Sequence, residues 1–303
     1  TLSDVVKGPG VNNLLIITLK GTAMGAADLV PGISGGTVAL ITGIYQKLIN
    51  ALKVVTSNPL LIIHFQRFVK TPEVIFLINL LFGIVIGIVG LSRLIEFLFN
   101  NYVIATWSFI GGLVFSAVIF LVWQIKSWDI YKISLMFIGI LIGQFIVFLP
   151  LLNTEHDAYI IFISGFLAIS AMLLPGISGS YILVLLGQYA FMITAVNNLN
   201  IITLLIFIAG AITGLLTFTK FIYFIINRWK ENTTILMTGL IIGSLTKLWP
   251  WKDVLDKNTY PTNWENIYNS DPQILLSITL FISGITIAIC ISFLSIKLSK
   301  AIS

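Results

Sequence analysis

Charged side chains are scarce in this sequence of 303 residues. Aspartate, glutamate, lysine and arginine make up 10% of the chain and apolar residues 57%, whereas a soluble domain carries about 25% charged residues. The net charge is +5, but so low a charge density leaves no basic face for nucleic acid. The composition therefore excludes a nucleic-acid-binding protein and indicates a membrane protein in contact with lipids.

Cysteine and histidine are almost absent. The one cysteine, Cys290, lies in an apolar stretch, and the two histidines are His64 and His156. These counts exclude a disulfide framework and a cysteine-rich metal site, and they disfavour a relay of histidines. We expect neither a metal nor another cofactor.

Long apolar runs take up most of the chain. A helix needs about 20 mostly apolar residues to cross a bilayer. Six runs are predicted to cross: Val74–Phe99, Val103–Gln124, Ile133–Leu151, Ile201–Asn227, Thr233–Trp249 and Gln273–Ile296. The sequence thus predicts an all-α polytopic membrane protein.

Two further apolar regions are interrupted. Asn13–Val55 and Tyr159–Val196 are each long enough for two helices, but each contains Pro-Gly-Ile-Ser-Gly in its middle. Proline removes a backbone donor and glycine weakens a helix, so each region should be a helical hairpin broken at its tip. We expect the hairpins to re-enter the membrane, although hydropathy alone also allows them to cross it fully.

The chain contains an internal repeat. A shift of 144 residues aligns Gly21–Tyr45 with Gly165–Tyr189, and a shift of 127 aligns later glycines, with Arg93 opposite Lys220. Ten positions of the first alignment are identical: Gly21, Ala27, Leu29, Pro31, Gly32, Ile33, Ser34, Gly35, Gly43 and Tyr45. Each half is therefore predicted to contain one broken hairpin and three transmembrane helices.

An odd number of crossings in each half makes the repeats inverted. Each half crosses three times if its hairpin re-enters and five times if it does not, so the second half starts from the opposite side. Inverted repeats with broken helices are typical of secondary transporters, whose substrate site lies near the midplane. Within one membrane domain, 1–303, we predict a first repeat over 12–151, a second over 158–298 and a small extracytoplasmic cap loop over 250–272.

Lysine and arginine predict the orientation. With the N-terminus inside, two lysines, Lys252 and Lys257, fall in outer segments, and eleven basic residues fall in cytoplasmic ones. The eleven are Lys7, Lys47, Lys53, Arg67, Lys70, Lys126, Lys132, Arg228, Lys230, Lys297 and Lys300. By the positive-inside rule, both termini are predicted to be cytoplasmic.

The two hairpin tips are the strongest candidates for a binding site. A new helix should begin near Ser34 and near Ser178, and the free N–H groups of a helix start bind phosphate or carboxylate. The candidate phosphate-binding residues are Ser34, Gly35, Gly36, Thr37, Ser178, Gly179 and Ser180. The alternative is that each Pro-Gly kinks a helix that its serine caps. Because the motif occurs twice, we favour one shared anion site at mid-membrane.

Ionisable residues inside the apolar segments are the second group of candidates, because charge is costly there. Arg93 and Lys220 are candidate phosphate ligands, with snorkelling to the headgroups as the alternative. Arg93 could also pair with Glu96 one turn later. Lys20 and Asp28 are eight residues apart on one helix face, and they are candidates for an ion pair or for coupling to an ion.

The residues of the tips carry a resemblance. The stretch Lys20–Tyr45, together with Leu-Leu-Pro-Gly-Ile-Ser-Gly-Ser at 173–180, resembles the bacterial polyprenyl-phosphate transporter family of PopT type, formerly a domain of unknown function. The similarity runs from Lys20 to about Lys297. It implies a flippase-like carrier that moves undecaprenyl phosphate from the outer to the inner leaflet of the cytoplasmic membrane, which recycles the carrier lipid of cell-wall synthesis. Proton or sodium coupling is expected on a separate ground, because the acid Asp28 is present at one tip only.

Two other functions stay open at this stage. One is a secondary transporter of a small soluble anion. The other is an intramembrane polyprenyl-diphosphate phosphatase, which needs a nucleophile or base beside arginines, or carboxylates that hold a metal. The only acids inside the predicted spans and hairpins are Asp28 and Glu96, so we expect a transporter and not an enzyme.

Overall fold

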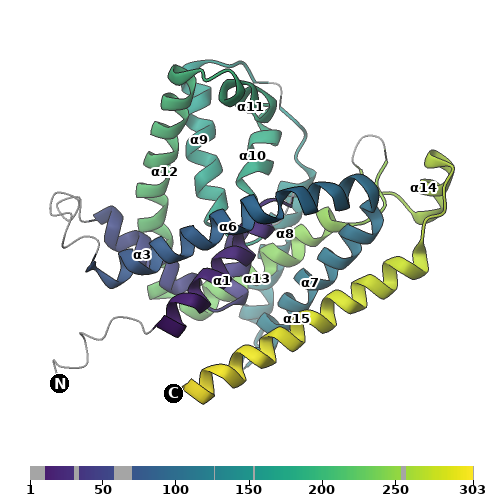
Figure 1. Ribbon diagram of the computed structural model, residues 1–303, viewed down its shortest axis with the longest axis horizontal. Helices are drawn as coiled ribbons and strands as arrows, with labels where there is room; N and C mark the ends of the chain where they lie inside the picture. The colour runs from purple at the N-terminus through teal and green to yellow at the C-terminus, as the bar shows by residue number, and fades with distance from the viewer. Residues whose placement is uncertain are drawn as a thin grey trace. The chain divides into compact units, whose positions relative to one another are not determined.

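The computed structural model describes residues 11–30, 34–57, 70–125, 127–152, 154–253 and 257–302 (Figure 1). Nearly all of this part of the chain is helical, and its β structure is one isolated bridge between Lys252 and Asn258. The predicted all-α fold is therefore confirmed. Pro31–Ile33, the first three residues of the first Pro-Gly-Ile-Ser-Gly, lie outside the described residues, as do Lys7, His64, Arg67 and Lys126.

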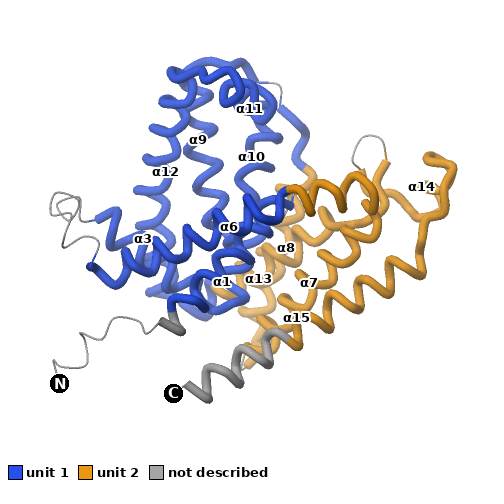
Figure 2. Tube along the Cα trace, in the orientation of Figure 1, with its two compact units in different colours: residues 1–92, 149–233 blue, residues 93–148, 234–303 orange. Residues whose placement is uncertain are grey.

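The chain forms two compact units, blue and orange in Figure 2. The first contains residues 1–92 and 149–233, and the second contains 93–148 and 234–303. Each unit takes segments from both predicted repeats. The compact units therefore do not coincide with the repeats at 12–151 and 158–298, and those boundaries stay a prediction.

The first unit contains both hairpins and the helix that follows each of them. Its helices are α1 (Val11–Asp28), α2 (Gly35–Ile41), α3 (Tyr45–Ser57), the first part of α6 (Pro72–Asn101), α9 (Ala158–Met172), α10 (Gly179–Leu185), α11 (Tyr189–Asn197) and α12 (Ile201–Arg228). The second unit contains the end of α6, α7 (Val103–Trp123), α8 (Ile130–Phe148), most of α13 (Lys230–Ser244), a 3-10 turn η1 (Leu245–Leu248), α14 (Pro261–Tyr268) and α15 (Ile274–Ile302).

Four helices are long and apolar enough to cross a membrane, namely α6, α7, α8 and α12. The bent pairs α2–α3 and α10–α11 meet the same criterion together, which raises the number of candidate spans to as many as six in the described residues. Of the other predicted spans, one corresponds to α13, 15 residues long, with η1. The other corresponds to α15, whose side chains are described up to Cys290. The chain is thus a multi-pass membrane protein.

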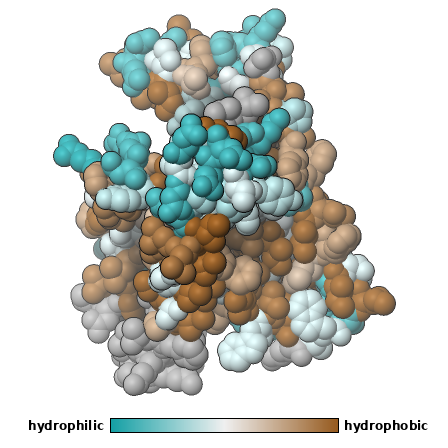
Figure 3. Space-filling model, turned by 90° about the vertical axis from the view of Figure 1, so that its right-hand side faces the viewer, coloured by the Kyte–Doolittle hydropathy of each residue, from teal (hydrophilic) through white to brown (hydrophobic). Residues whose placement is uncertain are grey.

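Large apolar side chains cover much of the surface, as Figure 3 shows on one face. On α6 and α12, Val89 and Ile202 expose more than 70% of their surface. An apolar area of this extent marks contact with lipid in a membrane protein.

The hairpins differ from the prediction in having three helices each. A second break follows α2 and α10, and the chain turns there by 119° and 109°. Gly43 and Gly187 adopt φ of 72° and 69° at these turns. The N–H of the next residue bonds back to Ala39 O or to Leu183 O, at 2.9 Å in both hairpins, which is the glycine-terminated helix end of the Schellman type. Gly43 was among the ten repeated positions, so the sequence contained this signal.

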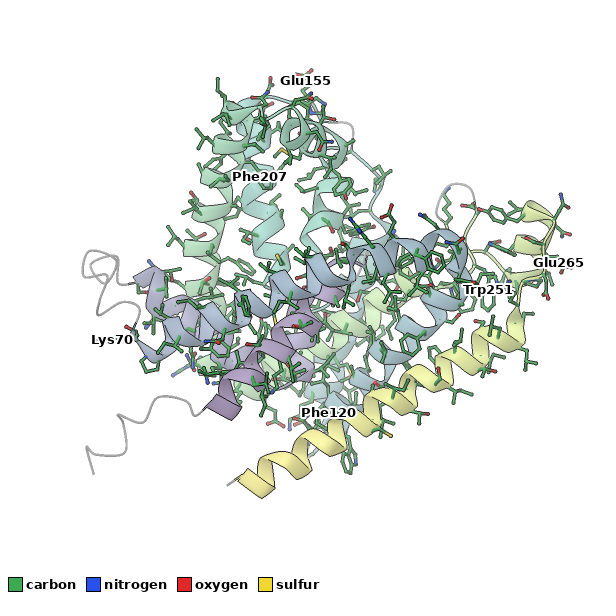
Figure 4. All side chains as sticks on the ribbon, in the orientation of Figure 1. Lys70, Phe120, Glu155, Phe207, Trp251 and Glu265 are labelled. Atoms are coloured by element: carbon green, nitrogen blue, oxygen red, sulfur yellow. The ribbon has the colours of Figure 1, made fainter. Side chains whose placement is uncertain are left out.

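Glycine contacts repeat with the same shifts as the sequence. A Cβ at Gly83 of α6 would overlap Thr18 O of α1, and a Cβ at Gly210 of α12 would overlap Phe162 O of α9. Thr18 and Phe162 are 144 residues apart, and Gly83 and Gly210 are 127 apart. The same crossing brings Gly165 of α9 against Phe207 of α12, which is labelled in Figure 4. Small residues at these crossings allow the backbones to touch.

In the second unit, helices of the first half of the chain pack against helices of the second half. Gly112 of α7 lies against Phe281 O of α15, and Gly239 of α13 lies against Met136 O of α8. Each pair joins a helix of the first half to a helix of the second, and the shifts between equivalent residues are 127 and 145. The contacts therefore support an internal repeat, while its inversion across the membrane stays a prediction.

The segment 250–272, predicted as a cap, belongs to the second unit and contacts α7 through Lys252. The indole of Trp251, labelled in Figure 4, donates to Pro272 O at 2.9 Å. Lys252 Nζ lies 4.3 Å from the ring centre of Trp107. The short helix α14 buries none of its residues. That this segment is extracytoplasmic stays a prediction.

Candidate functional site: the paired hairpin tips

The two hairpin tips contact each other within the first unit. Ser34 Oγ donates to Met172 O at 3.2 Å, and Tyr45 OH donates to Leu173 O at 2.6 Å. The N–H of Gly176 donates to Thr37 Oγ1 at 2.8 Å. The structure therefore brings together two segments that lie about 140 residues apart in the sequence.

Side chains of the same chain occupy the start of α2 at the first tip. Ser34 is the N-cap, and its Oγ accepts from the Gly36 N–H at 3.1 Å. Asp28 Oδ1 accepts from the Gly35 N–H at 2.7 Å. A carboxylate at a helix N-terminus is favourable because it meets the positive end of the helix dipole. The anion at this helix start is thus the protein's own aspartate.

Lys20 holds the other end of the same short helix. Its Nζ donates to Thr42 O, the C-cap residue of α2, at 2.7 Å. A cation is favourable at a helix C-terminus. Lys20 and Asp28, considered as an ion pair from the sequence, therefore act at opposite ends of α2, and no ion pair joins them in the described residues.

The described residues of the first tip leave little polar surface for a ligand. Ser34 and Thr37 are 1% and 2% exposed, and Gly35 and Gly36 are buried. Asp28 Oδ2 is buried and lacks a hydrogen-bond partner among the described residues. This oxygen is an acceptor, which binds a proton or a cation but not a phosphate anion.

The second tip lacks both charges. Met172 stands at the position equivalent to Asp28, and Ser164 at the position equivalent to Lys20. Ser178 is the N-cap of α10, but its side chain accepts no hydrogen bond from a backbone N–H at the start of the helix. Its Oγ lies 2.7 Å from Ser180 Oγ instead. Ser180 is exposed, and Gly179 is partly exposed.

Glycine is required in the second tip for two reasons. Gly176 has φ of 90°, a conformation that L side chains rarely adopt,. A Cβ at Gly179 would lie 2.6 Å from Ala168 O of α9. Gly179 therefore allows α10 to pack closely against α9, so a larger residue there would disturb packing as well as any bound anion.

The charged candidates of the spans are exposed. Arg93 and Glu96 are both exposed on α6, and no ion pair joins them in the part of the chain that the structure describes. Lys220 is exposed on α12. Arg93 belongs to the second unit, whereas Lys220 and both tips belong to the first. Lys220 forms no hydrogen bond to a tip residue within the described ranges.

Tyr45 is a site residue that the sequence interpretation did not single out. It begins α3 just after the glycine turn, it is 4% exposed, and its hydroxyl reaches Leu173 of the other hairpin. Its identity with Tyr189 was a signal, but Tyr189 is 43% exposed. Only the contact across the two hairpins separates their roles.

Comparison with known proteins agrees with a transporter. Residues 24–266 match the family model described as VCA0040-like, undecaprenyl phosphate translocase-like. The chain is 35% identical over 294 residues to a polyprenyl-phosphate transporter of Vibrio cholerae, covering 91% of this chain and 96% of that protein. It is 34% identical over 251 residues to a polyprenyl-phosphate transporter of Staphylococcus aureus, covering 77% and 85%. No solved structure matches. The chain therefore belongs to the undecaprenyl phosphate translocase-like family, and it is a multi-pass membrane transporter and not an enzyme.

Proposed function

We propose that this protein carries polyprenyl phosphate across the bacterial cytoplasmic membrane, from the outer to the inner leaflet, and so recycles the carrier lipid of cell-wall synthesis. Family membership and the names of the relatives support the substrate. The observation that carries the proposal is the difference between the tips. Asp28 occupies the start of α2, whereas the equivalent position at the second tip is held by neutral Met172.

The phosphate headgroup would bind at the second tip, near Ser178, Gly179 and Ser180. Two hydroxyls that bond to each other use one donor, so the Ser178–Ser180 pair keeps one O–H for an anion,. A hydrogen bond from a hydroxyl to a charged oxygen is short and about twice as strong as a neutral one. This site contains fewer residues than the one expected from the sequence. Residues of the first tip would hold the second tip in place without contacting the phosphate, namely Ser34, Gly35, Gly36 and Thr37.

The apolar surface suits a lipid substrate. The exposed faces of α6 and α12 carry large apolar side chains such as Val89, Ile202 and Leu205. A long isoprenoid tail can remain in the bilayer along such faces while the headgroup enters the protein. A carrier of small soluble anions would need no lipid-exposed route.

Hairpins that re-enter the membrane agree with the packing in the first unit. Gly210 and Gly214 of α12 contact Phe162 and Phe166 of α9 in the same order, so the two helices run in the same direction. Leu152 N–H donates to Leu185 O at 2.7 Å, which returns the end of α10 to the segment that leads into α9. We propose that α9 enters the membrane, α10 turns back, and α12 then crosses.

Cytoplasmic termini and inverted repeats can be tested by labelling. Single cysteines would be introduced at Asn198 and at Lys70 in a Cys290→Ser background, because Cys290 is exposed. A membrane-impermeant maleimide added to intact cells should label position 198 and not position 70. Labelling of both positions from outside would contradict the inversion.

Coupling to protons or sodium belongs to the proposal as well. Asp28 is its candidate residue, because Oδ2 is buried without a hydrogen-bond partner in the described structure. Transport of polyprenyl phosphate into proteoliposomes should then accelerate under a proton or a sodium gradient. The same transport rate with and without both gradients would contradict coupling but would not contradict transport of the lipid.

The decisive experiment is a leaflet-resolved transport assay in proteoliposomes. The wild-type protein should move polyprenyl phosphate and release no inorganic phosphate from it. Replacing both Ser178 and Ser180 with alanine should weaken transport by about 10- to 100-fold, because a hydrogen bond to a charged group contributes about 1.5–3 kcal/mol. Ser134→Ala is the control, since Ser134 is an exposed helical serine of α8. Normal transport by the double variant, or transport of inorganic phosphate in place of the lipid, would overturn the proposal.

A further inference from the structure

We infer that the first hairpin is a fixed template that positions the second tip, and that Tyr45 and Thr37 are positioning residues for the headgroup site. This inference rests on the proposed function, because it assumes that the second tip binds the headgroup. Three side chains of the first hairpin bond to three backbone groups of the second tip. Ser34 and Tyr45 donate to the carbonyls of residues 172 and 173, and Thr37 accepts from the N–H of residue 176.

Two of the three equivalent residues of the second hairpin, Ser178 and Tyr189, form no such bond to the first tip in the described residues. Ser178, the counterpart of Ser34, bonds to Ser180 of its own tip. Tyr189, the counterpart of Tyr45, is 43% exposed, and it has no hydrogen bond to the first tip in the described residues. The bonds that Ser34 and Tyr45 make to the second tip therefore have no counterparts from Ser178 and Tyr189 in the described part of the chain.

The supporting helix is itself held at both ends. Asp28 bonds to the first turn of α2 and Lys20 to its C-cap, and both side chains come from α1. The Gly43 turn at the end of α2 then sets the direction in which Tyr45 begins α3. A helix held in this way cannot shift without breaking charge-assisted hydrogen bonds, which are the stronger kind.

The three hydrogen bonds from the first hairpin satisfy backbone groups that the break between α9 and α10 leaves without partners inside a helix. The end of α9 leaves carbonyls without partners inside the helix, and the turn before α10 leaves an N–H group free. Buried backbone groups must find partners, because an unsatisfied one is costly. By satisfying residues 172, 173 and 176, the first hairpin fixes the backbone that leads into Ser178 and Ser180. Loss of one of these bonds should let this loop adopt other conformations.

Paired variants test the inference in the whole protein. Tyr45→Phe removes the hydroxyl, with Tyr189→Phe as its control at the equivalent position. Thr37→Val removes the acceptor for the Gly176 N–H, whereas Thr37→Ser keeps it. We expect Tyr45→Phe and Thr37→Val to raise the KM for polyprenyl phosphate by roughly tenfold, which is the loss of one net hydrogen bond. Tyr189→Phe and Thr37→Ser should keep the wild-type KM.

A second readout does not depend on transport. Ser180→Cys in the Cys290→Ser background gives one reactive group at the second tip, since Ser180 is exposed. Its rate of maleimide labelling should change severalfold when Tyr45→Phe or Thr37→Val is added, and should not change with Tyr189→Phe. Thermal unfolding of each variant, followed in detergent, should show that the protein remains folded.

The outcomes separate the two proposals. If the wild-type protein fails to transport polyprenyl phosphate while the labelling rates change as expected, the proposed substrate is wrong and the template survives. If transport is normal in Tyr45→Phe and the labelling rate is unchanged, the template is wrong and the proposed function survives. Equal defects in Thr37→Ser and Thr37→Val would also overturn the template, because the serine keeps the acceptor oxygen.

Discussion

The two hairpins share Pro-Gly-Ile-Ser-Gly but differ in their surroundings. At the first, α2 is buried, with Asp28 bonded at its start and Lys20 at its end. At the second, Met172 and Ser164 stand at the equivalent positions, and Ser180 is exposed at the start of α10. Two residues outside the repeated motif therefore distinguish the tip whose helix is bonded at both ends by charged side chains from the tip whose helix start is exposed. A repeated motif need not have the same role in both copies.

The largest effect is expected when the second tip is made to resemble the first. Met172→Asp would place a carboxylate at the position equivalent to Asp28, where it would compete with the phosphate and repel it. Because juxtaposed like charges cost several kcal/mol, transport should fall by roughly 100-fold or more. Met172→Asn is the control of similar shape without the charge, and it should stay within about threefold of wild type by that reasoning. Equal rates for the two variants would show that the phosphate does not bind near this position.

The next prediction concerns what the two hairpins share. Gly83→Ala and Gly210→Ala each introduce a Cβ that overlaps a backbone carbonyl of the preceding hairpin helix. Each should lower the free energy of unfolding by about 1–3 kcal/mol, the usual cost of overpacking. Gly90→Ala is the control, because no atom lies within 4 Å of its added Cβ. The midpoint of thermal unfolding in detergent measures the effect. A large difference between Gly83→Ala and Gly210→Ala would show that the equivalent crossings are not energetically alike.

A smaller difference in stability is expected between variants of Lys20, which bonds to the end of α2, and of Ser164 at the equivalent position. Lys20→Met removes the donor to Thr42 O and should cost about 1–3 kcal/mol of stability, the range for a hydrogen bond to a charged group. Ser164→Ala at the equivalent position removes a buried hydroxyl that has no hydrogen-bond partner among the described residues. This change should therefore be neutral or stabilising, by the same principle. Chemical unfolding of both variants gives the comparison. Equal destabilisation would mean that the hydrogen bond from Lys20 to the end of α2 does not stabilise the folded protein.

The smallest effect is expected at the two exposed cations. Arg93→Gln and Lys220→Gln should each reduce transport by roughly two- to tenfold, the range expected for a weakened attraction of the headgroup. If the repeats are inverted, one variant should impair loading from the outer leaflet and the other from the inner leaflet. Initial rates from protein reconstituted in each orientation measure this. Wild-type rates for both would leave snorkelling to the headgroups as their only role.

Much of the architecture could be predicted from local sequence. The apolar runs predicted α6, α7, α8 and α12, because membrane helices satisfy their own backbone within a single segment. The shared Pro-Gly-Ile-Ser-Gly predicted the breaks before α2 and α10. The second break in each hairpin could also have been read from the repeated Gly43 and Gly187, since a helix end with positive φ favours glycine,.

The candidate site could be predicted in part. The sequence predicted that the two tips converge, and the structure joins them through hydrogen bonds in the first unit. It also predicted equal roles for Ser34 and Ser178. Their bonds differ, because Ser34 bonds to Met172 of the other hairpin, 138 residues away, while Ser178 bonds to Ser180. No local pattern distinguishes the two serines.

The sequence by itself determined a multi-pass helical membrane protein with a repeated hairpin broken at its tip, because hydropathy, proline and glycine act within a few residues of where they stand. Only the tertiary structure decided that α7 packs on α15 and α8 on α13, that Lys20 and Asp28 hold the two ends of α2, and that Tyr45 supports the second tip. These outcomes depend on which distant backbone groups a side chain can reach. That choice is made when the helices pack, because each buried polar group must then find a partner.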